Sequence, residues 1–159
     1  MWFFMNTCYL LSLLTFGMLL LALLQSFFHF FIFKANHLTF MILTSIIYLF
    51  TETLIIFFFV GTGVSIKEYT LEHHLKPDYH RKSIAVKRRV YPPLLLNMLC
   101  MIILFALVGA VDTGRISVWI YQTLFGLCIV HFIFVKKIQH ECFRDNTNNI
   151  LRMAGVEGV

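Results

Sequence analysis

Glu52 is the first residue to suggest chemistry, because it is the only charged side chain in a long apolar segment. It lies within SIIYLFTETLIIFFFVGTG, residues 45–63. At helical spacing Ser45, Tyr48 and Glu52 fall on one stripe, with Thr51 at its edge. A polar stripe on an apolar helix normally faces other helices rather than lipid. Glu52 is therefore predicted to face the interior of a helix bundle.

Three interpretations of Glu52 are compatible with the sequence. Transfer out of water favours the neutral form of a carboxyl group, so a protonated Glu52 would join helices through hydrogen bonds. The partners expected at a similar depth are Tyr48, Gln25 and Gln122. An ionisable group inside a membrane also marks proton or ion pathways, and it can contact a neighbouring subunit. We expect the structural role, because the predicted spans hold no second acid at this depth.

The elements that would position Glu52 are apolar segments long enough to cross a membrane. The chain has 159 residues, of which 59% are hydrophobic and 13% charged, whereas soluble domains contain about 25% charged residues. A soluble fold of this size cannot bury so much apolar surface. We predict an all-α polytopic membrane protein with four transmembrane helices in a single domain, residues 1–159. The predicted spans are about residues 10–31, 38–66, 94–111 and 116–135.

Two polar segments accompany these spans. Residues 67–93 are predicted to form a cytoplasmic basic loop. Pro92 and Pro93 are predicted to open the third span, because the N–H that a proline lacks has no partner at a helix start. Residues 136–159 are predicted to form a cytoplasmic tail, in which residues 145–149 mark a turn before a short C-terminal helix.

Basic residues are distributed unevenly among the connecting segments. The 67–93 segment holds seven and the tail holds four, whereas the two short turns hold one each, Lys34 and Arg115. Cytoplasmic segments of membrane proteins carry an excess of Lys and Arg. By this positive-inside rule, both termini and the basic loop are predicted to be cytoplasmic. The side chains expected beside anionic lipid headgroups are Arg81, Lys82, Lys87, Arg88, Arg89, Lys136 and Lys137.

Histidines are the other residues whose chemistry suggests a cofactor. His29 and His37 flank the first turn and would face each other in a hairpin, although haem ligands in bundles usually lie deeper. Carboxylates and imidazoles on the cytoplasmic side are typical iron or zinc ligands, but no closed spacing such as HExxH occurs. No cofactor is predicted, with haem b or iron as the alternative. The candidate metal ligands are His29, His37, His73, His74, His80 and His140.

Three classes of function are compatible with these features. The absence of a complete catalytic constellation favours a non-catalytic integral membrane subunit or accessory protein of a larger complex, in a homo- or hetero-oligomer. The alternatives are a small proton- or ion-coupled transporter or channel that uses Glu52, and a haem- or metal-binding membrane redox subunit. The expected partners are other transmembrane subunits and anionic lipid headgroups. Nucleic acid is not expected, because the basic segment is tethered to the membrane and has few aromatic residues.

Overall fold

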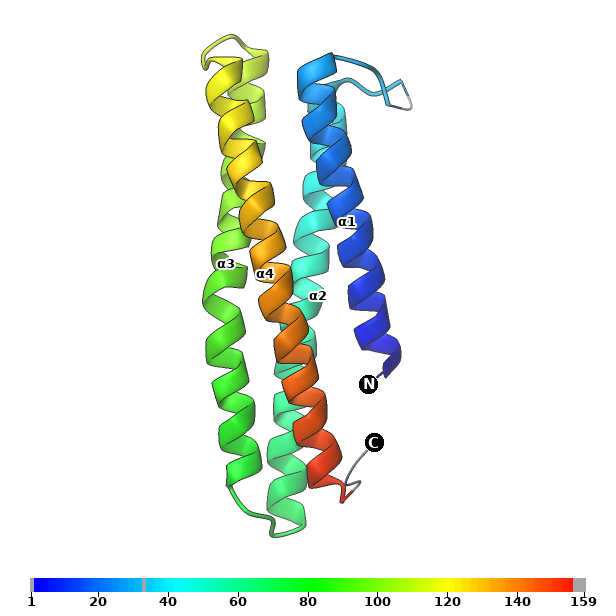
Figure 1. Ribbon diagram of the computed structural model, residues 1–159, viewed down its shortest axis with the longest axis vertical. Coiled ribbons are helices and arrows are strands. Elements are labelled where there is room, and N and C mark those ends of the chain that lie inside the picture. The colour runs from blue at the N-terminus through cyan, green and yellow to red at the C-terminus, as the bar shows by residue number, and fades with distance from the viewer. Residues whose placement is uncertain (1, 33, 156–159) are drawn as a thin grey trace.

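Four long helices form the protein, and the computed structural model describes residues 2–32 and 34–155. In chain order they are α1 (Trp2–Phe28), α2 (His37–Glu72), α3 (Asp78–Asp112) and α4 (Val118–Met153). Each is long and apolar enough to cross a membrane. They run alternately up and down, with the α1–α2 and α3–α4 connections at one end and the α2–α3 connection at the other (Figure 1). The predicted all-α fold with four membrane-spanning helices is confirmed.

The two ends of the bundle differ in charge. The basic end carries the α2–α3 connection and the C-terminus of α4, and α1 begins in the half of the bundle nearer to it (Figure 1). The other end, which we call the opposite end, carries the α1–α2 and α3–α4 connections. Except for Lys34 and Arg115, all lysines and arginines lie between the middle of the bundle and the basic end. The uneven distribution of charge along the sequence is therefore also an uneven distribution along the bundle axis.

All four helices extend beyond the apolar segments expected from the sequence, and α3 and α4 do so by the most. The 36 residues of α2 span about 54 Å, whereas the hydrocarbon layer of a bilayer is about 30 Å thick. The segment 67–93, predicted as a loop, is helical except for the connection at residues 73–77. It remains helical because its charged residues leave one face of the helix free to pack against the bundle. Ser83 and Val90 are buried on that face. Pro92 and Pro93 consequently lie inside α3 rather than at its start.

The predicted tail continues α4 as well. Residues 145–149 are predicted to form a turn, since Asn and Asp side chains compete for backbone hydrogen bonds. In the bundle, Asn146 Nδ2 instead donates to Thr62 Oγ1 of α2 at 3.1 Å. Asn149 Nδ2 donates to the carbonyl oxygen of Tyr79 of α3 at 2.9 Å. These contacts with neighbouring helices keep the segment helical against its local preference.

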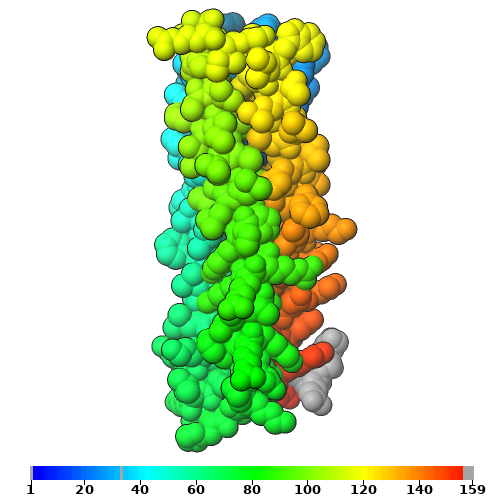
Figure 2. Space-filling view, turned by 90° about the vertical axis from the view of Figure 1, so that its left-hand side faces the viewer, coloured from blue at the N-terminus to red at the C-terminus, as the bar shows by residue number. Residues whose placement is uncertain are grey.

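Each helix packs against its neighbours in the chain, and α4 closes the bundle on α1. Figure 2 shows one face of the resulting rod, with α3 between α2 and α4. The buried apolar side chains form two clusters. One contains Leu104 and Phe125 and lies toward the opposite end, and the other contains Ile55 and Phe143 and lies toward the basic end. Glu52 lies between the two clusters.

Candidate functional site

Glu52 is completely buried and forms an ion pair with a lysine across the bundle. Its Oε1 lies 2.9 Å from Nζ of Lys136, and the exposed fractions of the two side chains are 0% and 19%. Glu52 belongs to α2 and Lys136 to α4, which lie diagonally opposite each other, so the pair crosses the interior. An unpaired charge in an apolar interior is far more costly than a paired one. Each partner therefore makes the burial of the other tolerable.

The remaining hydrogen-bonding groups of this pair are also occupied. Gln139 Nε2 donates to Glu52 Oε2 at 2.7 Å, and Asn97 Nδ2 donates to Oε1 at 3.3 Å. The Lys136 ammonium also donates to Gln139 Oε1 at 2.9 Å and to Ser12 Oγ at 3.1 Å. An ammonium group has three N–H donors. Glu52, Gln139 and Ser12 thus provide one acceptor for each of them.

Asn97 extends these contacts within the bundle. Its Oδ1 lies 3.2 Å from Nδ1 of His131, and its backbone carbonyl accepts a hydrogen bond from the Tyr48 hydroxyl at 3.2 Å. Since Asn97 Nδ2 donates to Glu52, its Oδ1 is the acceptor, which assigns a proton to His131 Nδ1. All four helices contribute to what we call the Glu52 network. Its members are Ser12, Tyr48, Glu52, Asn97, His131, Lys136 and Gln139.

Every buried side-chain nitrogen and oxygen of the Glu52 network has a hydrogen-bond partner. Buried atoms without a partner occur elsewhere in the described residues, for example Gln25 Oε1 and His37 Nδ1, but none belongs to this network. Fully satisfied polar networks rigidify a core and specify one arrangement of its elements. The chemistry this geometry supports best is therefore the fixing of four helices relative to one another.

The interior between the Glu52 network and the opposite end holds one of the two apolar clusters, together with the buried hydroxyl groups of Thr44 and Ser45. Met101, Leu104 and Phe125 are buried there. A cavity of about 10 Å³ borders this region beside Tyr48 and Asn97, which is at the lower limit of the volume that one water molecule occupies.

The structure does not bring Gln25 and Gln122, two of the expected partners, to Glu52. Glu52 lies about 22 Å along α2 from its first residue, whereas Gln25 lies in the last turn of α1. Gln25 donates to two carbonyl oxygens of the α1–α2 connection, and Gln122 Nε2 donates to the carbonyl oxygen of Ser26 at 2.9 Å. Both glutamines therefore hold together the opposite end of the bundle.

The polar stripe of α2 lies in the interior, where Ser45 bonds within α2 and the other members contact different helices. Tyr48 and Thr51 are buried beside Glu52. Neither donates to its carboxylate: Tyr48 bonds to α3, and Thr51 Oγ1 lies 3.1 Å from Thr15 Oγ1 of α1. These contacts tie α2 to its neighbours on both sides of the ion pair.

Lys136 is the functional residue that the sequence reasoning misplaced. The apolar segment of the fourth predicted span ends at residue 135, just before Lys136. Lys136 was therefore expected to lie beside lipid headgroups. Because α4 continues to Met153, Lys136 lies near the middle of the helix and turns inward. The available signal was the helical spacing of Phe132, Val135 and Gln139, which are buried on the same face.

The other basic side chains of the expected headgroup set remain toward the basic end. Arg89 forms ion pairs with Glu141 and, at 3.5 Å, with Asp145, so its guanidinium is engaged within the protein. Lys87 is half-buried, and its side chain crosses α2 at Gly63, where a larger residue would occupy the same space. Arg89 is nevertheless exposed, as are Arg81, Lys82, Arg88 and Lys137.

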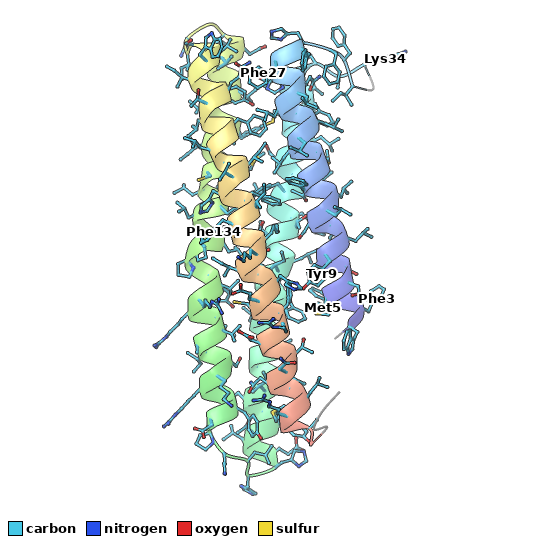
Figure 3. All side chains as sticks on the ribbon, viewed as in Figure 1. Phe3, Met5, Tyr9, Phe27, Lys34 and Phe134 are labelled. Carbon is cyan, nitrogen blue, oxygen red and sulfur yellow. The ribbon has the colours of Figure 1, made fainter. Side chains whose placement is uncertain are left out.

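The six candidate metal ligands are dispersed along the bundle. His29 and His37 lie at the opposite end, and three others lie at or near the α2–α3 connection: His73, His74 and His80. His140 Nδ1 lies 2.8 Å from the Tyr9 hydroxyl, and Figure 3 shows Tyr9 projecting from α1 toward α4. Within residues 2–32 and 34–155, no three His, Cys, Asp or Glu side chains are grouped to hold a metal ion.

Comparison with protein-family models, with curated proteins and with solved structures finds no match to this chain. Its function must therefore be inferred from the Glu52 network and from the outer surface of the bundle.

Proposed function

We propose that the protein is a non-catalytic subunit of a larger membrane complex, and that the Glu52 network holds its four helices in a fixed arrangement. The observation that carries this proposal is the completeness of the network. Glu52 bonds to both Lys136 and Asn97, these two bond to further side chains, and every buried side-chain nitrogen and oxygen of the network has a partner. Acid–base catalysis and ion transport need a group that reaches a substrate or exchanges protons with water. Ser12, Lys136 and Gln139 also line the groove between α1 and α4 that is described below, but their polar groups are engaged by one another and by Glu52, which supports a structural role.

The surface that supports partner binding surrounds the N-terminal half of α1. Phe3 and Leu13 are exposed over 86% and 69% of their surface, and Figure 3 shows Phe3 pointing away from the bundle. The seam between α1 and α4 contains an apolar groove of about 480 Å³, lined by Leu13, Phe16 and Ile133 among others. Helices associate in lipid through close packing rather than through a hydrophobic force. This groove offers a partner helix a surface into which it can pack.

A second apolar groove adjoins the same part of the molecule. It has a volume of about 510 Å³ and lies between α2 and α4, with Phe4 of α1, Phe57 and Ile150 among its lining residues. The proposed interface is therefore the side of the bundle where α1 meets α4, together with the part of α2 beside the start of α1. The occupant we propose is a transmembrane helix of another subunit.

The proposal includes an orientation in the membrane. The excess of basic residues at the basic end supports a cytoplasmic location for that end and for both termini. The exposed Lys82, Arg88 and Lys137 would then lie near the anionic headgroups of the inner leaflet, or near an acidic neighbouring subunit.

Purification from native membranes tests the proposed role. The tagged protein, extracted into nanodiscs and weighed by native mass spectrometry, is expected in an assembly with at least one further transmembrane chain. Leu13→Trp should fill part of the α1–α4 groove and reduce the amount of the partner. Leu99→Trp is the matched control, because Leu99 is 51% exposed on α3, away from this groove.

Two outcomes would contradict the proposal. One is a monomer that carries no other chain in either the wild type or the variants. The other is Glu52-dependent ion flux in liposomes containing the purified protein, which would favour a transporter.

A further inference from the structure

A second polar site lies at the opposite end of the bundle, separate from the Glu52 network. Residues at the ends of all four helices surround a pocket of about 370 Å³, which falls in the size range of small-molecule sites. Gln25, Ser26 and Tyr121 line it and are buried. His29 and Asp112 also line it and are exposed. The pocket thus has a buried polar floor and an exposed mouth.

Gln25 provides an unsatisfied acceptor to this pocket. Its side chain is only 1% exposed, and its Nε2 donates to the carbonyl oxygens of Phe30 at 2.9 Å and Ala35 at 3.0 Å. Since carbonyl oxygens only accept, these bonds fix which end of the amide carries the nitrogen. The Oε1 has no partner among the described residues. A buried acceptor without a donor costs free energy, so a donor in the pocket would be stabilised there.

His37 and Asp112 add two further acceptors. His37 Nε2 lies 2.9 Å from the Tyr121 hydroxyl, whereas its Nδ1 has no partner. In the tautomer whose Nε2–H donates to the Tyr121 hydroxyl, the lone pair of Nδ1 is an acceptor, and a ligand donor at Nδ1 would select this tautomer. Asp112 contributes a carboxylate at the end of α3, and it forms no ion pair with another described residue. The buried atoms of this lining that lack a partner are therefore acceptors, and the Asp112 carboxylate adds a negatively charged one.

We propose that this pocket binds a primary organic ammonium compound with a short apolar body. A primary ammonium group has three N–H donors, which complement the acceptors that line the pocket: Gln25 Oε1, the Asp112 carboxylate, and His37 Nδ1 in the tautomer whose Nε2 donates to Tyr121. Its positive charge complements the carboxylate. This site is independent of the subunit role proposed above, because none of its residues belongs to the Glu52 network.

The other walls of the pocket distinguish this ligand from its competitors. Phe30, Leu38 and Val108 line it and suit a hydrocarbon body better than a hydrated inorganic ion. A metal ion lacks its ligand set, since no three His, Cys, Asp or Glu side chains of the described residues are grouped to hold one. An anion would face the Asp112 carboxylate. Two helices begin and two end at this pocket, so helix dipoles of both signs are present and do not favour an anion.

Titration with matched four-carbon probes tests the proposal. Protein with ¹⁵N-labelled histidine, in nanodiscs, is titrated with n-butylammonium chloride, n-butanol or sodium butyrate at constant pH. The readout is the imidazole signal of His37, assigned by its loss in His37→Gln. We expect a saturable shift with the ammonium probe only.

Variants locate the binding. Asp112→Asn should raise the dissociation constant of the ammonium probe roughly tenfold or more, the effect of losing one charged hydrogen bond. Asp145→Asn, at the basic end, should leave it unchanged. Gln25→Leu should also weaken binding, provided that its circular dichroism matches the wild type. Because Asp112 is exposed, its variant is expected to fold normally and decides the test on its own.

Several results would overturn the proposal. Equal saturation by n-butanol would indicate a neutral hydroxyl site, and saturation by zinc chloride with loss of ammonium binding would indicate a metal site. A shift that grows linearly with concentration would indicate partitioning into the bilayer. The absence of a shift, or an unchanged dissociation constant in Asp112→Asn, would show that the pocket does not bind ammonium compounds as proposed.

Discussion

Replacing Lys136 with leucine tests the Glu52 network most directly. The substitution removes the 2.9 Å ion pair and leaves the carboxylate of Glu52, which is 0% exposed, with only Gln139 and Asn97 as donors. Removing one partner of a buried ion pair costs about 3–5 kcal/mol, because the remaining charge is buried without compensation. We expect Lys136→Leu and Glu52→Leu each to lower the free energy of unfolding by about this amount.

The double variant Glu52→Leu/Lys136→Leu should be more stable than either single variant. It removes both charges together, and apolar replacements of whole buried pairs are often close to neutral. The amides of Asn97 and Gln139 then lose an acceptor, so we expect a net loss of about 1–3 kcal/mol. Glu52→Gln keeps the shape of the side chain but leaves the Lys136 ammonium without a counter-charge. Glu52→Gln should therefore lower the free energy of unfolding by about 3 kcal/mol. If Glu52 were instead protonated and neutral in the wild type, the same substitution would leave stability unchanged.

The assay is reversible unfolding in dodecyl maltoside micelles with an increasing fraction of sodium dodecyl sulfate, followed by near-ultraviolet circular dichroism of the aromatic core. Lys137→Leu is the control, because this neighbouring lysine is exposed and should change stability by no more than about 0.5 kcal/mol. The reasoning fails if Glu52→Gln is as stable as the wild type, or if the losses of the two single leucine variants simply add in the double variant.

Three further predictions concern other parts of the bundle. Asn97→Leu should lower the free energy of unfolding by about 1–3 kcal/mol in the same assay, because its amide bonds to Glu52 and His131; no loss would show these bonds to be dispensable. Gly63→Ala should leave the free energy of unfolding unchanged or raise it by up to about 1 kcal/mol, because alanine favours a helix and the new methyl group meets mainly the flexible end of the Lys87 side chain. A large loss of stability would show that the Lys87 side chain cannot move aside. In a cysteine-free background, Thr113→Cys should react with an impermeant maleimide on intact cells and Asp78→Cys only after permeabilisation, whereas the reverse pattern would contradict the proposed orientation.

Hydropathy by itself determined the class of this protein and the number of its helices. The transfer of an apolar side chain out of water is a local property that adds up along a segment, so a run of such residues identifies a helix that spans a membrane whatever it packs against. For the same reason the sequence singled out Glu52, because a carboxyl group within such a run is unusual without any knowledge of its neighbours.

Only the tertiary structure decided where the helices end and what Glu52 contacts. Asn146 and Asn149 favour a turn locally, yet their hydrogen bonds to α2 and α3 hold them within α4. The partner of Glu52 depends on how α2 and α4 align along the bundle axis, which follows from the packing of side chains over their whole length. That alignment placed Lys136 in the core beside Glu52 rather than at the membrane surface, because two opposite charges bury together at far lower cost than either one alone.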